Sequence, residues 1–150
     1  RNRECQAHRS FVDARINDED LMKFAHLTLA TRDVIATAEF FESTLGWQKI
    51  RHDDNIETKA AWLEIGPGQE LHLLHVPDFV PTPYEQEFGR HVAIFVTSSQ
   101  FEQLPQRLVE RGATLIEPKR ETPFARFFFR DPQGYVFEVI DEDAYLAATS

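Results

Sequence analysis

Three histidines and one glutamate stand on predicted strands, and together they have the chemistry of a metal site. They are His26, His72, His91 and Glu138. Glu138 lies within the apolar run from Tyr135 to Ile140, where a carboxylate is costly unless a cation, a metal ion or water lies beside it. Imidazoles and one carboxylate leave a bound divalent ion with net positive charge, so the ion can stabilise an oxyanion. Such ligands permit Zn, Ni, Co, Fe or Mn.

The four residues belong to a pattern that occurs twice along the chain. His26 and His91 are 65 positions apart, and His72 and Glu138 are 66 apart, so one inserted residue brings the two halves into register. A period of this size is typical of a supersecondary unit used twice, because one such unit cannot bury its apolar face alone. We therefore predict two similar modules whose equivalent strands bring these side chains to one point.

Each half is predicted to be a βαβββ module. In module one, residues 23–76, the hydrophobic pattern predicts strands over 24–31, 47–51, 58–65 and 70–76 and a helix between Asp33 and Gly46. In module two, residues 91–142, it predicts strands over 91–97, 114–117, 124–130 and 135–141 and a helix between Ser98 and Gly112. We expect Pro105 near the first turn of that second helix, where its missing N–H costs little.

Three further segments complete the domain organisation. Residues 1–22 are a polar N-terminal extension, residues 77–90 connect the modules, and residues 143–150 form a C-terminal tail after the domain at 23–142. The connector is long for an ordinary loop, which favours an arm over a site or across a dimer partner. A chain of 150 residues is expected to form one core.

Simpler interpretations apply to several of these side chains. A single histidine on a strand is more often hydrogen-bonded than metal-bound, and Glu138 can instead form a salt bridge with Arg126 on the neighbouring strand. Glu70 shares a strand face with His72 and is a reserve ligand. The other histidines are interpreted as solvent-facing: His8, His52 and His75. The runs of phenylalanine are expected to pack in the core or an interface.

Composition restricts the class of partner. The formal charge of −9 argues against nucleic acid or an anionic membrane, and no apolar run approaches the ~20 residues of a membrane helix. The lone Cys5 excludes an internal disulfide framework and fits a reducing compartment, so we expect a cytoplasmic protein. The expected partner is a small molecule.

Several motifs together resemble the vicinal oxygen chelate superfamily over about residues 23–142. They are His-Leu-Thr-Leu from residue 26, Phe-Phe-Glu-Ser-Thr-Leu-Gly-Trp from residue 40, and above all Asp-Pro-Gln-Gly-Tyr from residue 131, followed by Glu138. The resemblance implies an α+β fold in which two βαβββ modules form a cupped, mostly antiparallel sheet around one divalent metal ion. It also implies His26, His72, His91 and Glu138 as ligands, with Glu138 as a proton-carrying base.

The resemblance leaves three functions open. We expect a metal-dependent, glyoxalase-like enzyme that chelates neighbouring oxygens of a small substrate and moves a proton; the alternatives are a metal-free binding protein of the bleomycin-resistance type and an extradiol-type dioxygenase. Glyoxalase I usually has a carboxylate at the position of His72, an arginine at that of Ala30 and an Asn-Trp-Gly run at residues 76–78. The last two features help hold glutathione in that enzyme, so their absence here argues against its glutathione-dependent reaction. A homodimer is expected, and the candidate substrate contacts are Arg126, Trp62 and Tyr135.

Overall fold

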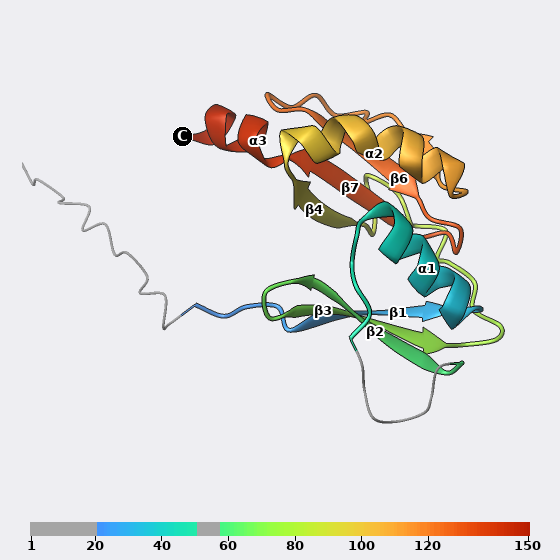
Figure 1. Cartoon of the computed structure of the whole chain (residues 1–150). Helices are drawn as coiled ribbons and strands as arrows, with labels where there is room; N and C mark the ends of the chain where they lie inside the picture. Colours follow the sequence, from blue (N-terminus) through green and yellow to red (C-terminus); the bar gives the residue numbers. More distant parts are fainter. Residues whose placement is uncertain (1–20, 51–57) are drawn as a thin grey trace, which may run out of the picture.

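The computed structural model describes residues 21–50 and 58–150, which form two small sheets and their helices (Figure 1). The first sheet has the strand order β1-β3-β2 and the second the order β4-β7-β6-β5. The strands are β1 (His26–Thr31), β2 (Ala60–Gly66), β3 (Gln69–His75), β4 (Val92–Val96), β5 (Thr114–Ile116), β6 (Arg126–Arg130) and β7 (Val136–Asp141). The helices are α1 (Val34–Thr44), α2 (Ser98–Glu110) and α3 (Glu142–Thr149).

The two sheets repeat one topology. In each, the first strand runs parallel to the last, β1 beside β3 and β4 beside β7. The remaining pairs, β2 with β3, β5 with β6 and β6 with β7, are antiparallel. The expected α+β class and the repetition of one module are confirmed.

Local sequence explains where the first two helices begin and end. The Asp33 side chain accepts a hydrogen bond from the backbone of Ala36 at the start of α1, and Thr97 forms a capping box at the start of α2. Gly46 follows α1 with a φ of 74°, and Gly112 follows α2 with a φ of 92°. Glycine adopts this left-handed conformation without steric cost, so it allows the chain to leave the helix.

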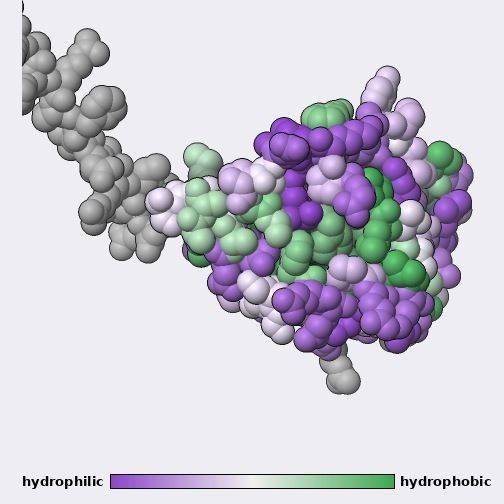
Figure 2. Space-filling model, turned by 90° about the horizontal axis from the view of Figure 1, so that it is seen from above, coloured by the Kyte–Doolittle hydropathy of each residue, from purple (hydrophilic) through white to green (hydrophobic). Residues whose placement is uncertain are grey.

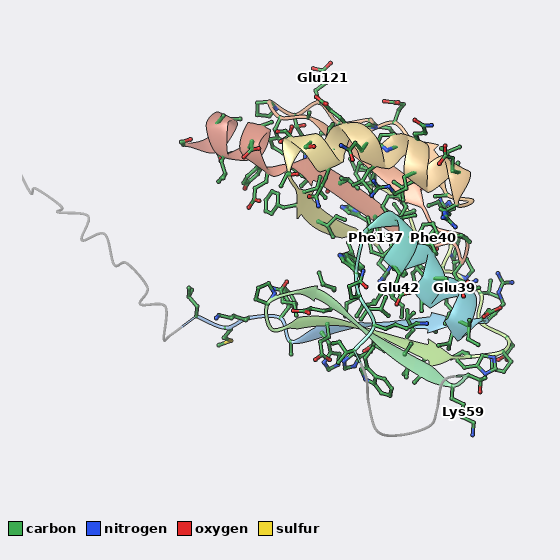
Figure 3. All side chains as sticks on the ribbon, in the orientation of Figure 1. Glu39, Phe40, Glu42, Lys59, Glu121 and Phe137 are labelled. Atoms are coloured by element: carbon green, nitrogen blue, oxygen red, sulfur yellow. The ribbon has the colours of Figure 1, made fainter. Side chains whose placement is uncertain are left out.

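One core joins the two halves. Phe41 of α1 packs on Phe137 of β7 with ring centroids 5.6 Å apart, and Phe129 stacks on Phe137 at 5.2 Å. Figure 3 shows Phe40 and Phe137 where α1 meets the second sheet, whereas Glu121 points away from the molecule. Helix α1 therefore lies between the two sheets, as Figure 1 also shows.

Some apolar residues stay on the surface. Figure 2 shows, from above, hydrophobic residues gathered across the middle of this face between hydrophilic margins. In the second half of the chain, Phe95 is 50% exposed and Leu146 is 55% exposed.

Two expectations about single elements need correction. The strand predicted over 47–51 is reduced, in its described part, to an isolated bridge between Lys49 and Leu63. Pro105 lies two turns inside α2 rather than near its first turn. The helix tolerates it because Leu104 and Leu108 are buried, and this burial offsets the lost backbone hydrogen bond. The C-terminal tail forms most of α3.

Candidate functional site

His91 and Glu138 form a close pair on the second sheet. His91 directly precedes β4, and Glu138 lies in β7 opposite Ala93 of β4. The His91 Nε2 atom is 3.3 Å from Glu138 Oε2, and the two side chains are 24% and 10% exposed. The expected proximity of this histidine and this glutamate is therefore present within one chain.

The tautomer of His91 follows from its other ring nitrogen. His91 Nδ1 lies 3.2 Å from the backbone oxygen of Gln86, and because a carbonyl only accepts, Nδ1 must carry the proton. In the neutral ring, Nε2 then presents a lone pair toward Glu138 Oε2. Two lone pairs that face each other need a cation between them, either a second proton on the ring or a metal ion. The donor set of this pair therefore fits a divalent metal ion.

The second oxygen of Glu138 is held by an arginine. Arg126 Nη1 donates to Glu138 Oε1 at 2.9 Å, and Arg126 Nη2 donates to Glu87 Oε1 at 2.8 Å. The Arg126 side chain is only 3% exposed. Although burial opposes it, the hydrogen bonds to Glu138 and Glu87 raise the pKa of Arg126. The salt bridge between Arg126 and Glu138 that the sequence allows is thus present.

Glu87, in the connector, is fixed from several sides. Its carboxylate accepts backbone N–H groups from Lys119 at 2.7 Å and Arg120 at 3.1 Å, besides the guanidinium of Arg126. Although desolvation acts in the opposite direction, these hydrogen bonds and the positive charge lower the pKa of Glu87 to about 2. Glu87 therefore stays ionised beside Arg126 at neutral pH.

His26 and His72 form a second pair, on the first sheet. Their rings stack with centroids 4.0 Å apart and planes 13° from parallel. His72 Nε2 lies 2.7 Å from Glu70 Oε2, so the reserve ligand contacts a predicted ligand. Trp62, opposite His72 in the β2–β3 ladder, meets its ring edge-on at 6.1 Å. By strand alternation, this pair lies on the sheet face opposite the buried side chain of Leu71.

The two pairs remain separate within one chain. Across residues 21–50 and 58–150, no three His, Cys, Asp or Glu side chains are arranged so that they could hold a metal ion. The structure thus brings His91 to Glu138 and His26 to His72, but it does not gather all four ligands in a single copy. That all four share one ion stays a prediction.

Tyr135 lies at the junction of the two halves. It is 8% exposed, its hydroxyl donates to the backbone oxygen of Ala30 at 2.9 Å, and its ring stacks on Phe79 at 5.1 Å. Burial raises the pKa of Tyr135. These contacts give Tyr135 a packing role, whereas Trp62 lies beside the histidine pair, where a substrate contact is expected.

Sequence reasoning misses two connector residues that orient the His91–Glu138 pair, namely Gln86 and Glu87. The only signal is the length of the connector, which favours an arm over a site without identifying the residues that act there. Among the remaining histidines, His75 is exposed as expected, while His8 and His52 lie outside the described residues.

A hollow of about 250 Å³ lies elsewhere, between α1, Arg111 and the turn at residues 131–133. Its lining includes Asp131 but none of the predicted ligands. We therefore place the candidate site at the His91–Glu138 pair, where the side-chain chemistry converges. Within the described ranges, no helix is both long and apolar enough to cross a membrane.

Comparison with known proteins gives consistent matches. The sequence model of the Glyoxalase/Bleomycin resistance protein/Dioxygenase superfamily matches residues 23–139. Glutathione transferase FosA of Serratia marcescens is 30% identical over 120 residues, covering 79% of this chain and 80% of that protein. Glyoxylase I 4 of Arabidopsis thaliana is 24% identical over 140 residues, covering 85% of this chain and 75% of that protein.

Solved structures share the fold. A glyoxalase/dioxygenase from Nostoc punctiforme superposes with a TM-score of 0.66 at 22% identity, covering 87% of this chain and 97% of that one. A mutant of the fosfomycin resistance protein FosX from Listeria monocytogenes, solved with Mn(II) and 1S,2S-dihydroxypropylphosphonic acid, gives 0.65 at 16% identity. That match covers 80% of this chain and 90% of the FosX chain.

Proposed function

The chain belongs to the glyoxalase/bleomycin resistance protein/dioxygenase superfamily, and we propose that it is a metal-dependent, glyoxalase-like enzyme acting on a small oxygenated molecule. The observation that carries the proposal is the His91–Glu138 pair. Its facing atoms, Nε2 and Oε2, are 3.3 Å apart, and Nδ1 of the ring is already used as a donor to Gln86. A divalent ion, one of Zn, Ni, Co, Fe or Mn, satisfies both facing lone pairs at once.

When bound, the ion supplies Lewis-acid chemistry to neighbouring oxygens of a substrate. The chain supplies the groups around it. If its bond to the ion loosens, Glu138 Oε2 can hold a proton taken from the substrate, while Arg126 keeps Oε1 of the same carboxylate in place at 2.9 Å. Trp62 offers an apolar ring beside His72, against which the carbon part of a substrate can pack.

A second copy of the chain completes each site in this proposal. One copy offers His91 and Glu138, and the other offers His26 and His72, so that a homodimer holds two equivalent sites. The separation of the two pairs within the described part of one chain supports this arrangement. In a two-fold dimer, each of the two sites takes the His91–Glu138 pair of one copy and the His26–His72 pair of the other. Two-fold symmetry is the most common symmetry of soluble homo-oligomers.

Metal analysis tests the metal dependence. Protein purified without a histidine tag is expected to contain about one divalent ion per chain, and His91→Ala is expected to lose most of it because the variant lacks one ligand. His75→Ala is the matched control, because His75 is an exposed histidine at the end of β3. Wild-type protein that takes up no stoichiometric divalent metal would overturn the proposal, and ligand binding unchanged by chelator would favour a metal-free binding protein.

Mixing of variants tests the dimer. His26→Ala and His91→Ala are each expected to bind metal poorly, whereas unfolding and refolding them together should restore binding in the mixed dimers. One of the two sites in a mixed dimer then has an intact His26 from one copy and an intact His91 from the other. If each site is formed within one chain, every site in the mixture lacks a ligand, and no binding returns.

A further inference from the structure

We propose that Glu87 is a positioning residue of the metal site: it holds Arg126 so that Glu138 directs one oxygen, Oε2, toward His91. This inference rests on the proposed function. It assigns a role to a connector residue that acts through Arg126.

The contacts form a chain of fixed groups. Lys119 and Arg120 hold the Glu87 carboxylate through backbone N–H groups at 2.7 and 3.1 Å. Glu87 in turn accepts from Arg126 Nη2 at 2.8 Å, and the same Nη2 donates to the backbone oxygen of Arg120 at 2.5 Å. With Nη2 used in this way, Nη1 is left for Glu138, and it donates to Oε1 at 2.9 Å.

Glu87 also affects the charge available at the metal site. A carboxylate paired alone with an arginine is neutralised by it and is a poor partner for a further cation. Here one guanidinium is shared between the carboxylates of Glu87 and Glu138, so the three groups carry a net charge of about −1. Glu138 therefore keeps negative charge for a cation at Oε2, on the side where His91 Nε2 lies 3.3 Å away.

The neighbouring connector residue acts on the other member of the pair. The backbone oxygen of Gln86 accepts from His91 Nδ1 at 3.2 Å and so directs Nε2 toward Glu138. Residues 86 and 87 thus orient both donors of the pair. Such groups behind metal ligands commonly change metal affinity by about 10- to 100-fold when they are replaced.

A purely structural role for Glu87 is the alternative, and Glu85 provides the matched control. Glu85 is also a connector carboxylate, and it is deeply buried, at 2% exposure. It pairs with Arg90 at 2.5 Å and accepts the backbone N–H of Val136 at 2.8 Å. It therefore ties the same segment to the same sheet through Arg90 instead of Arg126.

The test measures Mn²⁺ affinity of the full chain by calorimetric titration. Glu87→Gln is expected to bind Mn²⁺ about 10- to 100-fold more weakly than wild type, and Glu85→Gln within about 3-fold of wild type, although both lower the melting temperature of the metal-free protein. Arg126→Lys keeps the positive charge but has one nitrogen where the guanidinium uses two, so it is expected to weaken Mn²⁺ binding as Glu87→Gln does.

Two results overturn the inference while leaving the proposed function intact. In the first, wild type and Glu87→Gln bind Mn²⁺ equally well. In the second, Glu85→Gln loses as much Mn²⁺ affinity as Glu87→Gln does. If Glu87→Gln does not fold, Arg126→Lys decides the question by the same measurement. Wild-type protein that binds no Mn²⁺, Zn²⁺, Ni²⁺, Co²⁺ or Fe²⁺ removes the proposed function, and this inference with it.

Discussion

Replacement of Asp131 by asparagine tests how a buried carboxyl shapes the stability of the fold. Asp131 begins the turn between β6 and β7, is 4% exposed, and accepts the backbone N–H groups of Gln133 at 3.0 Å and Tyr135 at 2.8 Å through Oδ1. Its Oδ2 is buried and has no hydrogen-bond partner among the described residues. Burial raises the pKa of Asp131 to about 6 from an ordinary value of 3.8, with a smaller contribution from the charge of Glu85.

The sign of the effect follows from proton linkage. Between pH 3.8 and about 6 the folded protein keeps the Asp131 proton that the unfolded chain has lost, so stability falls as the pH rises through this window. A shift of about two pKa units corresponds to about 3 kcal/mol, of which about 2 kcal/mol is lost between about pH 4.5 and about pH 7.5. Asparagine has no such proton and still offers Oδ1 to the turn.

Urea unfolding of wild type and Asp131→Asn at several pH values checks this. The free energy of unfolding of the variant minus that of wild type is expected to rise by about 2 kcal/mol from about pH 4.5 to about pH 7.5. A constant offset is also expected, because the buried asparagine N–H₂ group needs a partner, but this offset does not vary with pH. Glu121→Gln controls for the loss of one exposed negative charge. A difference that stays flat over the whole pH range would refute the reasoning.

Three further substitutions test the packing. Pro105→Ala is expected to raise the free energy of unfolding by about 1–3 kcal/mol in urea titrations, because it restores a backbone donor inside α2, and a loss of stability would contradict this. Phe129→Ala should cost about 3–5 kcal/mol by the same assay, whereas its control Phe88→Ala, at a residue 66% exposed, should stay within about 0.5 kcal/mol. Tyr135→Phe removes the hydroxyl that donates to Ala30 and should cost about 0.5–1.5 kcal/mol; an unchanged melting curve would show that this bond contributes nothing.

Strand alternation is sufficient to predict which side chains share a face. Leu71 and Leu73 are fully buried, while Glu70 and His72 lie together on the other face and contact each other at 2.7 Å. This works because the strand period of two is set by the backbone and does not depend on tertiary partners. The repeat likewise predicts that His91 and Glu138 are neighbours, since equivalent strands in two related modules pair in the same way.

The same reasoning does not predict which side chains or backbone groups from distant segments contact a residue. The sequence predicts that Arg126 faces a substrate, yet Glu87, 39 positions earlier, takes part of its guanidinium. It also predicts that Tyr135 lines the site, yet the tyrosine hydroxyl reaches Ala30, 105 positions earlier. A strand pattern gives the face of a side chain, but the group that meets it there is decided by how a connector with no periodicity packs onto the sheet.

The position of α1 explains why the two pairs of predicted ligands remain separate in the described part of one chain. Phe41 of this helix meets Phe137 of the second sheet, and α1 also packs on β2 and β3 of the first sheet. Neighbouring residues in a strand point to opposite faces of the sheet. His72 in β3 and Glu138 in β7 each follow a residue that faces the core, so their side chains point away from α1, one from each sheet. Faces that look outward from a common helix do not meet across it, which supports the proposal that a second copy brings one face to the other. The mixed refolding of His26→Ala with His91→Ala therefore tests a direct consequence of the core.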